Sequence, residues 1–251
     1  MMDQLRLNND MLDTNLRSPK PSLFIALSGP GGTGKTTLIQ KWRRQSPEIE
    51  YIPNITTRKP RPTAQIDETG LYEFVTFKRF RELVEEGAFA QWVNPSPNKY
   101  YGTPIQPLYD AIEKGCDVVL DYTPQLYINF KRKFPDRTIG IFIIPPSLRH
   151  LLERLSNRGT ERGIDREIKV KMALQDLGYV GDHDYYLIND DIDETLETLK
   201  AIRRAESHRL SRHRRILSHY SEMAPHTMLF YYDPLDERLQ NTLGANLQGG
   251  T

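Results

Sequence analysis

The sequence predicts an α/β fold in which helices cover both faces of a doubly wound parallel sheet. A short apolar run, 22–27 (SLFIAL), leads directly into a glycine-rich loop, and the residues after that loop (TTLIQKWRRQ) have helical spacing. Two later runs, 117–121 (DVVLD) and 138–144 (TIGIFII), lack the polar alternation of a half-exposed strand. Strands of that kind are buried on both faces, as in a parallel sheet between helices.

The segments around these strands continue the alternation of strand and helix. Between the two later runs, 125–134 (QLYINFKRKF) has helical periodicity and ends before Pro135. Ser147 is the predicted N-cap of a helix with the sequence LRHLLERLSNR. A fourth strand is predicted at 184–188 (DYYLI). This order of elements is typical of a doubly wound sheet.

Residues 54–103 interrupt that order and predict a small inserted subdomain. They contain an Arg- and Pro-rich loop, short aromatic strands (LYEFVTF and FAQWV), one helix (KRFRELVEEG) and a tyrosine-rich turn. The core is then formed by 21–53 and 104–203. We expect residues 1–20 to be a disordered leader, and residues 204–251 to form a basic helical extension followed by a mobile tail.

The composition indicates a globular protein with one large domain. The chain has 251 residues, of which 38% are hydrophobic and 27% charged. No run of 18 apolar residues predicts a membrane span. The single cysteine, Cys116, is consistent with a reducing cytoplasm. A net charge of +1 gives no general attraction to nucleic acid, and the basic C-terminal helix is compatible with packing on a second subunit.

The glycine-rich loop, GPGGTGKT, predicts a phosphate-binding site of an NTPase or a kinase, and the loop alone does not choose between the two. Its glycines let backbone N–H groups turn toward an anion, and the helix that follows adds its positive N-terminal end. Lys35 is expected to reach the β- and γ-phosphates, while Thr36 and Asp121 supply oxygen ligands to Mg²⁺. The predicted ATP-binding residues of this segment are Gly29, Gly31, Gly32, Thr33, Gly34, Lys35, Thr36 and Thr37.

The inserted segment contains candidate ligands for a second phosphate. Arg58 and Arg61 lie three residues apart in a proline-stiffened loop, and two guanidinium groups suit a phosphate dianion. The stretch 99–103 (KYYGT) adds phenol and hydroxyl donors. Alone, either cluster is equally compatible with an ordinary solvated loop.

In combination, the motifs of this chain resemble those of the guanylate kinase family. SGPGGTGKTTL, TTRKPRP, YEFV, a Trp followed by YYGTP, DVVLD, IPPS, RLSNRGT and LINDD occur in this order over about 22–202. The resemblance implies a P-loop core, an inserted nucleoside-monophosphate-binding subdomain and a lid at about 157–168. It also implies a Mg²⁺-dependent kinase that transfers the γ-phosphate of ATP to GMP.

The resemblance also implies roles for individual residues. Arg58, Arg61, Tyr72 and Tyr101 correspond to the grip on the acceptor phosphate. Arg154 and Arg158 correspond to catalytic arginines on the lid side, and Asn189 to a contact with the donor nucleotide. No general base is needed, because the attacking group is already a phosphate oxygen.

Three of the four positions that correspond to the guanine-reading residues depart from the family pattern. Gln91 and Thr123 replace acidic residues, and Asn54 replaces a serine, whereas Thr103 is a type that the family uses. Three interpretations stay open: a working guanylate kinase that tolerates these changes, a kinase for another nucleoside monophosphate or phosphorylated metabolite, or a catalytically silent binding module. The complete P-loop argues against the last.

Overall fold

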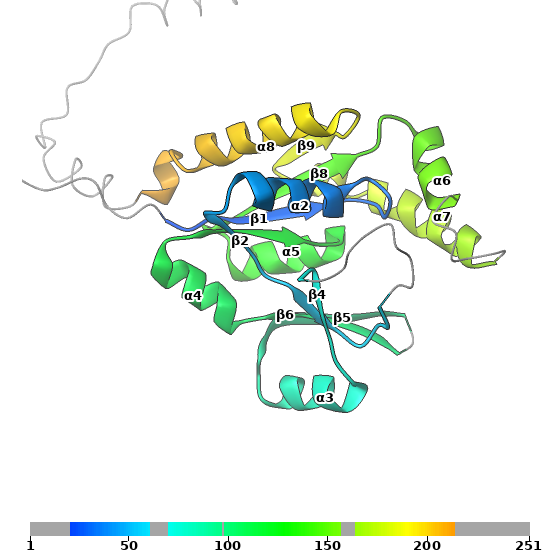
Figure 1. The fold of residues 1–251 in the computed structure, drawn as a ribbon, viewed down its shortest axis with the longest axis horizontal. Coiled ribbons are helices and arrows are strands. Elements are labelled where there is room, and N and C mark those ends of the chain that lie inside the picture. The colour runs from blue at the N-terminus through cyan, green and yellow to red at the C-terminus, as the bar shows by residue number, and fades with distance from the viewer. Residues whose placement is uncertain (1–20, 61–69, 97, 157–163, 214–251) are drawn as a thin grey trace, which may run out of the picture. The chain divides into compact units, whose positions relative to one another are not determined.

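The computed structural model describes residues 21–60, 70–96, 98–156 and 164–213, all within one compact unit, and contains two sheets (Figure 1). The five-stranded sheet has the order β2-β7-β1-β8-β9 and is parallel throughout. The four-stranded sheet has the order β4-β3-β6-β5. The strands are β1 Phe24–Ser28, β2 Ile49–Tyr51, β3 Asn54–Thr56, β4 Tyr72–Phe74, β5 Phe89–Ser96, β6 Lys99–Pro104, β7 Asp117–Asp121, β8 Thr138–Ile144 and β9 Tyr185–Ile188.

Helices cover both faces of the parallel sheet, which confirms the predicted α/β class (Figure 1). The α-helices are α2 Lys35–Gln45, α3 Phe77–Glu85, α4 Gln106–Lys114, α5 Pro124–Lys133, α6 Leu148–Ser156, α7 Ile164–Leu177 and α8 Ile192–Glu206. Two short 3₁₀ helices, η1 Val180–Asp182 and η2 Leu210–Arg212, lie beside them. The strands predicted at 117–121 and 138–144 have the predicted bounds, whereas the short β2 and the helix α4 were not anticipated.

Two apolar cores hold the helices to the sheet. Alternate residues of β1 enter different cores, so Ile25 and Leu27 join α2 and α8 while Phe24 and Ala26 join α4 and α5. All four side chains are fully buried. Because each large apolar side chain contributes about 1.5–3 kcal/mol when buried, a strand with apolar residues at every position is stable only between two helical layers.

Caps at two helix starts follow from local sequence. Ser147 accepts a hydrogen bond from the backbone N–H of His150 at 3.2 Å, which confirms the N-cap predicted for α6. Thr76 caps α3 by accepting from the N–H of Arg79 at 3.2 Å. The strand predicted as LYEFVTF is therefore shorter than expected, since β4 ends at Phe74 and the cap begins two residues later. Such caps typically stabilise a helix by about 1 kcal/mol.

The inserted segment forms the four-stranded sheet with α3 on one of its faces. Phe80 of α3 is 1% exposed and stacks on Phe89 of β5, with ring centroids 4.8 Å apart. Gly102 of β6 lies against the same ring, because a Cβ atom at this position would come within 2.4 Å of Phe89. The opposite face of this sheet is left to the candidate site described below.

The prediction of a basic helix from residue 204 onward is wrong for residues 207–213, the described residues after α8. Helix α8 ends at Glu206, and residues 207–213 form turns around η2. The cause is Glu206, whose side chain is 2% exposed and pairs with both Arg209 and Arg212. A continuous helix would keep Arg209 beside Glu206 but place Arg212 on another face, whereas the turn brings both guanidinium groups to one carboxylate. Residues 1–20 and 214–251 lie outside the described residues.

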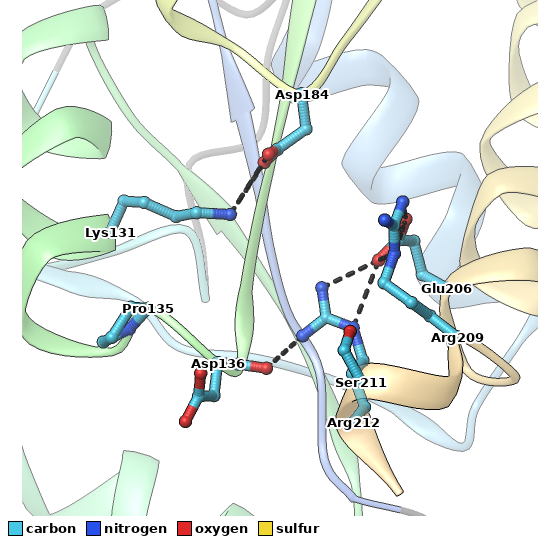
Figure 2. Close-up of a pocket in the computed structure, with 8 residues that line it drawn as sticks. All are labelled: Lys131, Pro135, Asp136, Asp184, Glu206, Arg209, Ser211 and Arg212. Atoms are coloured by element: carbon cyan, nitrogen blue, oxygen red, sulfur yellow. Dashed lines mark hydrogen bonds and ion pairs between the residues drawn. The ribbon is translucent and has the colours of Figure 1, made fainter. Parts of the chain in front are cut away.

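This ion-pair cluster borders a cavity of about 200 Å³ at the amino ends of β8 and β9 (Figure 2). The cations of the cavity already face carboxylates: Lys131 lies 3.0 Å from Asp184, and Arg212 lies 2.7 Å from Glu206. Arg212 also donates to the backbone carbonyl of Asp136. The contacts around the cavity therefore hold the residues that follow α8 against the loop before β8. Its lining residues are Lys131, Pro135, Asp136, Asp184, Glu206, Arg209, Ser211 and Arg212.

Glu206→Gln is expected to lower the free energy of unfolding by about 3 kcal/mol, because it leaves the buried guanidinium group of Arg212 without its carboxylate. Burial alone would raise the pKa of Glu206, but hydrogen bonds from Arg209, Tyr185 and Arg212 outweigh it and hold that pKa at about 2. The stabilisation is therefore complete above about pH 4.5, the ordinary value, and is lost as the pH falls toward 2. Urea unfolding at pH 7 and pH 3 measures both effects.

Glu197→Gln is the matched control, since Glu197 pairs with Lys200 on the same helix but is 71% exposed. We expect it to change the free energy of unfolding by less than about 1 kcal/mol. Equal losses in the two variants, or a loss at Glu206 that is the same at both pH values, would contradict the assignment.

Candidate functional site

The P-loop leaves the carboxyl end of β1 and opens α2, as the sequence predicts. Gly29, Gly32 and Gly34 have φ angles of 125°, 93° and 91°, which other residues rarely adopt. Gly34 is the N-cap of α2 and provides no side-chain hydrogen bond, so the first N–H groups of this helix are available to an anion. Lys35 Nζ folds back over the loop and donates to the carbonyls of Gly29 at 2.7 Å and Pro30 at 2.9 Å.

Thr36 and Asp121 come together at the same end of the sheet. The pairing of β1 with β7 sets Leu27 beside Asp121, so the carboxylate lies next to the start of α2. Thr36 Oγ1 donates to Asp121 Oδ2 at 3.4 Å. A hydroxyl and a carboxylate are the hard oxygen ligands that Mg²⁺ takes when phosphates and water complete its shell, so these residues fit the ion. Over the described ranges, no group of three or more His, Cys, Asp or Glu side chains offers another metal site.

Asn189 supports the P-loop from the end of β9. Its side chain is 5% exposed, and Nδ2 donates to the carbonyl of Thr33 at 2.7 Å, across 156 residues of sequence. A Cβ atom at Gly34 would lie 2.4 Å from the same nitrogen. The structure therefore brings Asn189 to the donor loop, while direct contact with the nucleotide stays a prediction.

The face of the small sheet opposite α3 carries a row of polar side chains, most of them buried. Strand register sets Tyr72 opposite Asn54 and Thr103 opposite Gln91. Strands β3 and β6 pair at Ile55 and Gly102, and a hydrogen bond from Thr103 to Asn54 joins the residues next to this pair. Residues directly opposite one another point to the same face of a sheet. We call Tyr72, Asn54, Thr103 and Gln91 the acceptor row. Four of the predicted acceptor residues therefore share one face although they come from four strands.

The acceptor row contacts the segment that joins β7 to α5. Asn54 Nδ2 donates to the backbone carbonyl of Asp121 at 3.3 Å, and Gln91 Nε2 donates to that of Leu126 at 3.1 Å. Thr103 Oγ1 donates to Asn54 Oδ1 at 2.8 Å. Asn54, Thr103 and Gln91 are 6%, 1% and 8% exposed, so these hydrogen bonds satisfy groups that burial would otherwise penalise.

Tyr122 completes this network and was missed by the sequence analysis. Its side chain is 2% exposed, and its hydroxyl lies 2.9 Å from Thr103 Oγ1. Burial raises the pKa of Tyr122, against opposing contacts with Thr103 and the amide of Gln91. The phenol is therefore protonated at neutral pH. An isolated tyrosine beside a Walker-B-type aspartate carries no sequence signal of its own, because the contact depends on how the two sheets meet.

Thr123 begins helix α5, next to Tyr122. It is exposed and caps α5, since its hydroxyl accepts from the backbone N–H of Leu126 at 3.4 Å. The role of Thr123 as a base-reading position therefore stays a prediction. The signal for this cap was present in the sequence, because a threonine followed by Pro124 is a typical start of a helix.

Arg58 lies among aromatic rings beside the acceptor row. Its guanidinium carbon is 4.9 Å from the ring centroid of Tyr72 and 5.3 Å from that of Phe74. Tyr101 meets Tyr72 edge to face at 6.4 Å. The structure thus gathers three predicted phosphate ligands, Arg58, Tyr72 and Tyr101, and adds Phe74 as a support for the arginine. Arg61 lies outside the described residues.

On the lid side, the structure tests only part of the prediction. Arg154 is half-buried in the last turn of α6, whereas Arg158 and most of the proposed lid lie outside the described residues. Asp176 of α7 was not anticipated. Burial raises its pKa, while the charge of Lys35 and the amide of Gln125 oppose that rise. Helix α7 therefore brings a carboxylate close enough to the P-loop lysine to respond to its charge.

Comparisons with known proteins agree with this site. The family model described as guanylate kinase matches residues 22–206. Guanylate kinase from Desulfitobacterium hafniense is 38% identical over 191 residues, which cover 76% of this chain and 93% of the relative. The enzyme of the same name from Caldanaerobacter subterraneus is 36% identical over 195 residues, covering 78% and 93%. The crystal structure of guanylate kinase from Anaplasma phagocytophilum superposes with a TM-score of 0.61 at 25% identity, covering 77% and 90% of the two chains.

Asn189→Asp is expected to raise the KM for ATP by about tenfold or more, because a carboxylate cannot donate to Thr33 and adds negative charge beside the phosphate loop. Steady-state kinetics with varied ATP measure the change. Asp190→Asn, which alters an exposed neighbour, is the control and should leave that KM within about twofold. An unchanged KM for ATP in Asn189→Asp would show that the amide does not support the donor loop.

Proposed function

Because this chain belongs to the guanylate kinase family, we propose that it transfers the γ-phosphoryl group of ATP to the 5′-phosphate of GMP, forming ADP and GDP. The observation that carries the proposal is the position of Asp121. Its carboxylate accepts from Thr36 at the end of the P-loop, and its backbone carbonyl accepts from Asn54 in the acceptor row. One residue therefore joins the predicted donor and acceptor sites.

The chemistry needs two anions held in line and their charge neutralised. An oxygen of the acceptor phosphate forms a bond to the γ-phosphorus as the bond to the β,γ-bridging oxygen breaks, and ADP leaves with that electron pair. Lys35 at the donor side and Arg58 at the acceptor side supply positive charge from this chain. Arg61, Arg154 and Arg158 are proposed to add to it as the lid closes and excludes water.

Mg²⁺ is proposed as the cofactor, held by Thr36 and Asp121 together with the phosphates. When bound, it would offset the charge of the β- and γ-phosphates. We also propose that the enzyme works in the cytoplasm, which the single cysteine of the sequence supports, since Cys116 has no second cysteine to pair with. Over the described ranges, none of the helices has the length and apolar character needed to cross a membrane.

Lys35→Ala is expected to lower kcat by at least about 100-fold, because it removes the cation placed nearest to the transferring phosphoryl group. A coupled assay of ADP release with GMP and ATP measures it. Lys41→Ala is a matched control on the same helix. The ammonium group of Lys41 pairs with the carboxylate of Asp193, 2.5 Å away, and not with the loop. Full activity in Lys35→Ala would exclude the assigned donor site.

Arg58→Ala is expected to raise the KM for GMP by about tenfold or more, with a smaller effect on the KM for ATP, because a charge-assisted contact to the acceptor phosphate is lost. Initial rates over a grid of both substrates separate the two constants. Arg79→Ala serves as the control, since Arg79 lies on α3 and pairs with Glu82 and Glu86 on the surface. A rise confined to the KM for ATP would reverse the assignment of donor and acceptor.

A further inference from the structure

The hydrogen bonds of the acceptor row run in one direction. Thr103 has a single hydroxyl proton, which it donates to Asn54 Oδ1. The contact between Thr103 and Tyr122 at 2.9 Å therefore has the phenol as its donor. Asn54 in turn donates through Nδ2 to the carbonyl of Asp121. Each proton of this chain points from Tyr122 toward Asp121, and none of these contacts involves a charged side chain.

The same network fixes the orientation of the Gln91 amide. Nε2 donates to the carbonyl of Leu126 at 3.1 Å, and the amide also lies against the Tyr122 hydroxyl, whose proton is already used on Thr103. The nitrogen of Gln91 thus faces two acceptors. Its oxygen, Oε1, is buried and has no hydrogen-bond partner among the residues that the structure describes. A buried carbonyl without a partner is unfavourable unless a ligand supplies a donor.

We propose that the acceptor pocket accepts 6-oxopurine nucleoside monophosphates as a class, hypoxanthine as well as guanine, because Gln91 Oε1 is a single neutral acceptor for a ring N–H. The proposal rests on the function proposed above and specifies the base that the same site reads. Gln91 lies in the acceptor row with Tyr72, on the face of the small sheet that carries the predicted phosphate ligands. The unpaired oxygen therefore lies on the sheet face assigned to the acceptor.

The chemistry of the bases explains this breadth. Guanine presents N1–H beside an N2 amine, whereas hypoxanthine presents N1–H alone. A carboxylate could accept both donors of guanine, but Gln91 offers one oxygen, and Thr123, which also caps α5, offers a neutral hydroxyl in place of a second carboxylate. A site that pairs a substrate N–H rejects an analogue without it by roughly 10⁴–10⁵-fold, and this pocket lacks such a dedicated partner for the N2 amine among its described residues. Adenine has a lone pair at N1, which would face the lone pairs of Oε1.

The test is kcat/KM of the full chain for GMP, IMP and AMP with ATP and Mg²⁺. We expect a GMP-to-IMP ratio below about 100 and AMP at least about 100-fold below IMP. A GMP-to-IMP ratio above that limit, or AMP used as well as IMP, would overturn the proposal. Absence of turnover with GMP would instead overturn the proposed function. Titration calorimetry of GMP, IMP and AMP would then still test the base preference by the same ratios of Kd.

Tyr122→Phe tests whether the hydroxyl orients Gln91. Without it, one acceptor of the Gln91 nitrogen is lost, and the amide is free to turn its N–H groups toward the base. We expect the preference for GMP over AMP to fall by about tenfold, a change that general destabilisation would not produce because it lowers both rates. Tyr127→Phe is the matched control, since this phenol is on the same helix as Leu126 and donates to Asp184. An unchanged GMP-to-AMP ratio in Tyr122→Phe would overturn the role of the phenol.

Discussion

The parallel pairing of β1 with β7 is the constraint on which the rest of this site depends. It sets Leu27 beside Asp121 at the carboxyl end of the sheet, where the P-loop begins. Ligands of doubly wound sheets bind at this edge because loops and helix N-termini converge there. Asp121 then serves two partners, Thr36 through its carboxylate and Asn54 through its backbone carbonyl. The donor loop and the acceptor row are consequently brought together at one residue.

Burial explains why the acceptor row is made of neutral groups that pair with one another. Asn54, Thr103 and Tyr122 lie at a junction of two sheets where an unpaired charge would cost several kcal/mol. Amides and hydroxyls form a satisfied network there without ionisation. The consequence is a pocket whose selectivity depends on the direction of a few hydrogen bonds. Such a network distinguishes bases by the positions of their hydrogen-bond donors and acceptors, and not by charge. This kind of selection favours a class of bases over a single base.

Stability and chemistry are located at opposite ends of the parallel sheet. The P-loop and Asp121 lie at the carboxyl ends of the strands, whereas Glu206 and its two arginines hold the end of α8 near the amino ends of β8 and β9 (Figure 2). The buried carboxylate has all its charge compensated by Arg209 and Arg212. The site at the other end keeps the first N–H groups of α2 available to an anion, so the ion-pair cluster does not compete with substrate binding.

The sequence by itself determined the features that depend on local chemistry: the P-loop turn, the fully apolar strands at 117–121 and 138–144, and the cap at Ser147. These need only backbone geometry, periodicity and a hydroxyl at the right position. Tertiary structure alone decided the orientation of Gln91 and the role of Tyr122, because their partners come from other strands and helices. The sequence pattern does not show how the two sheets pack against each other. That packing decides which buried polar groups form hydrogen bonds.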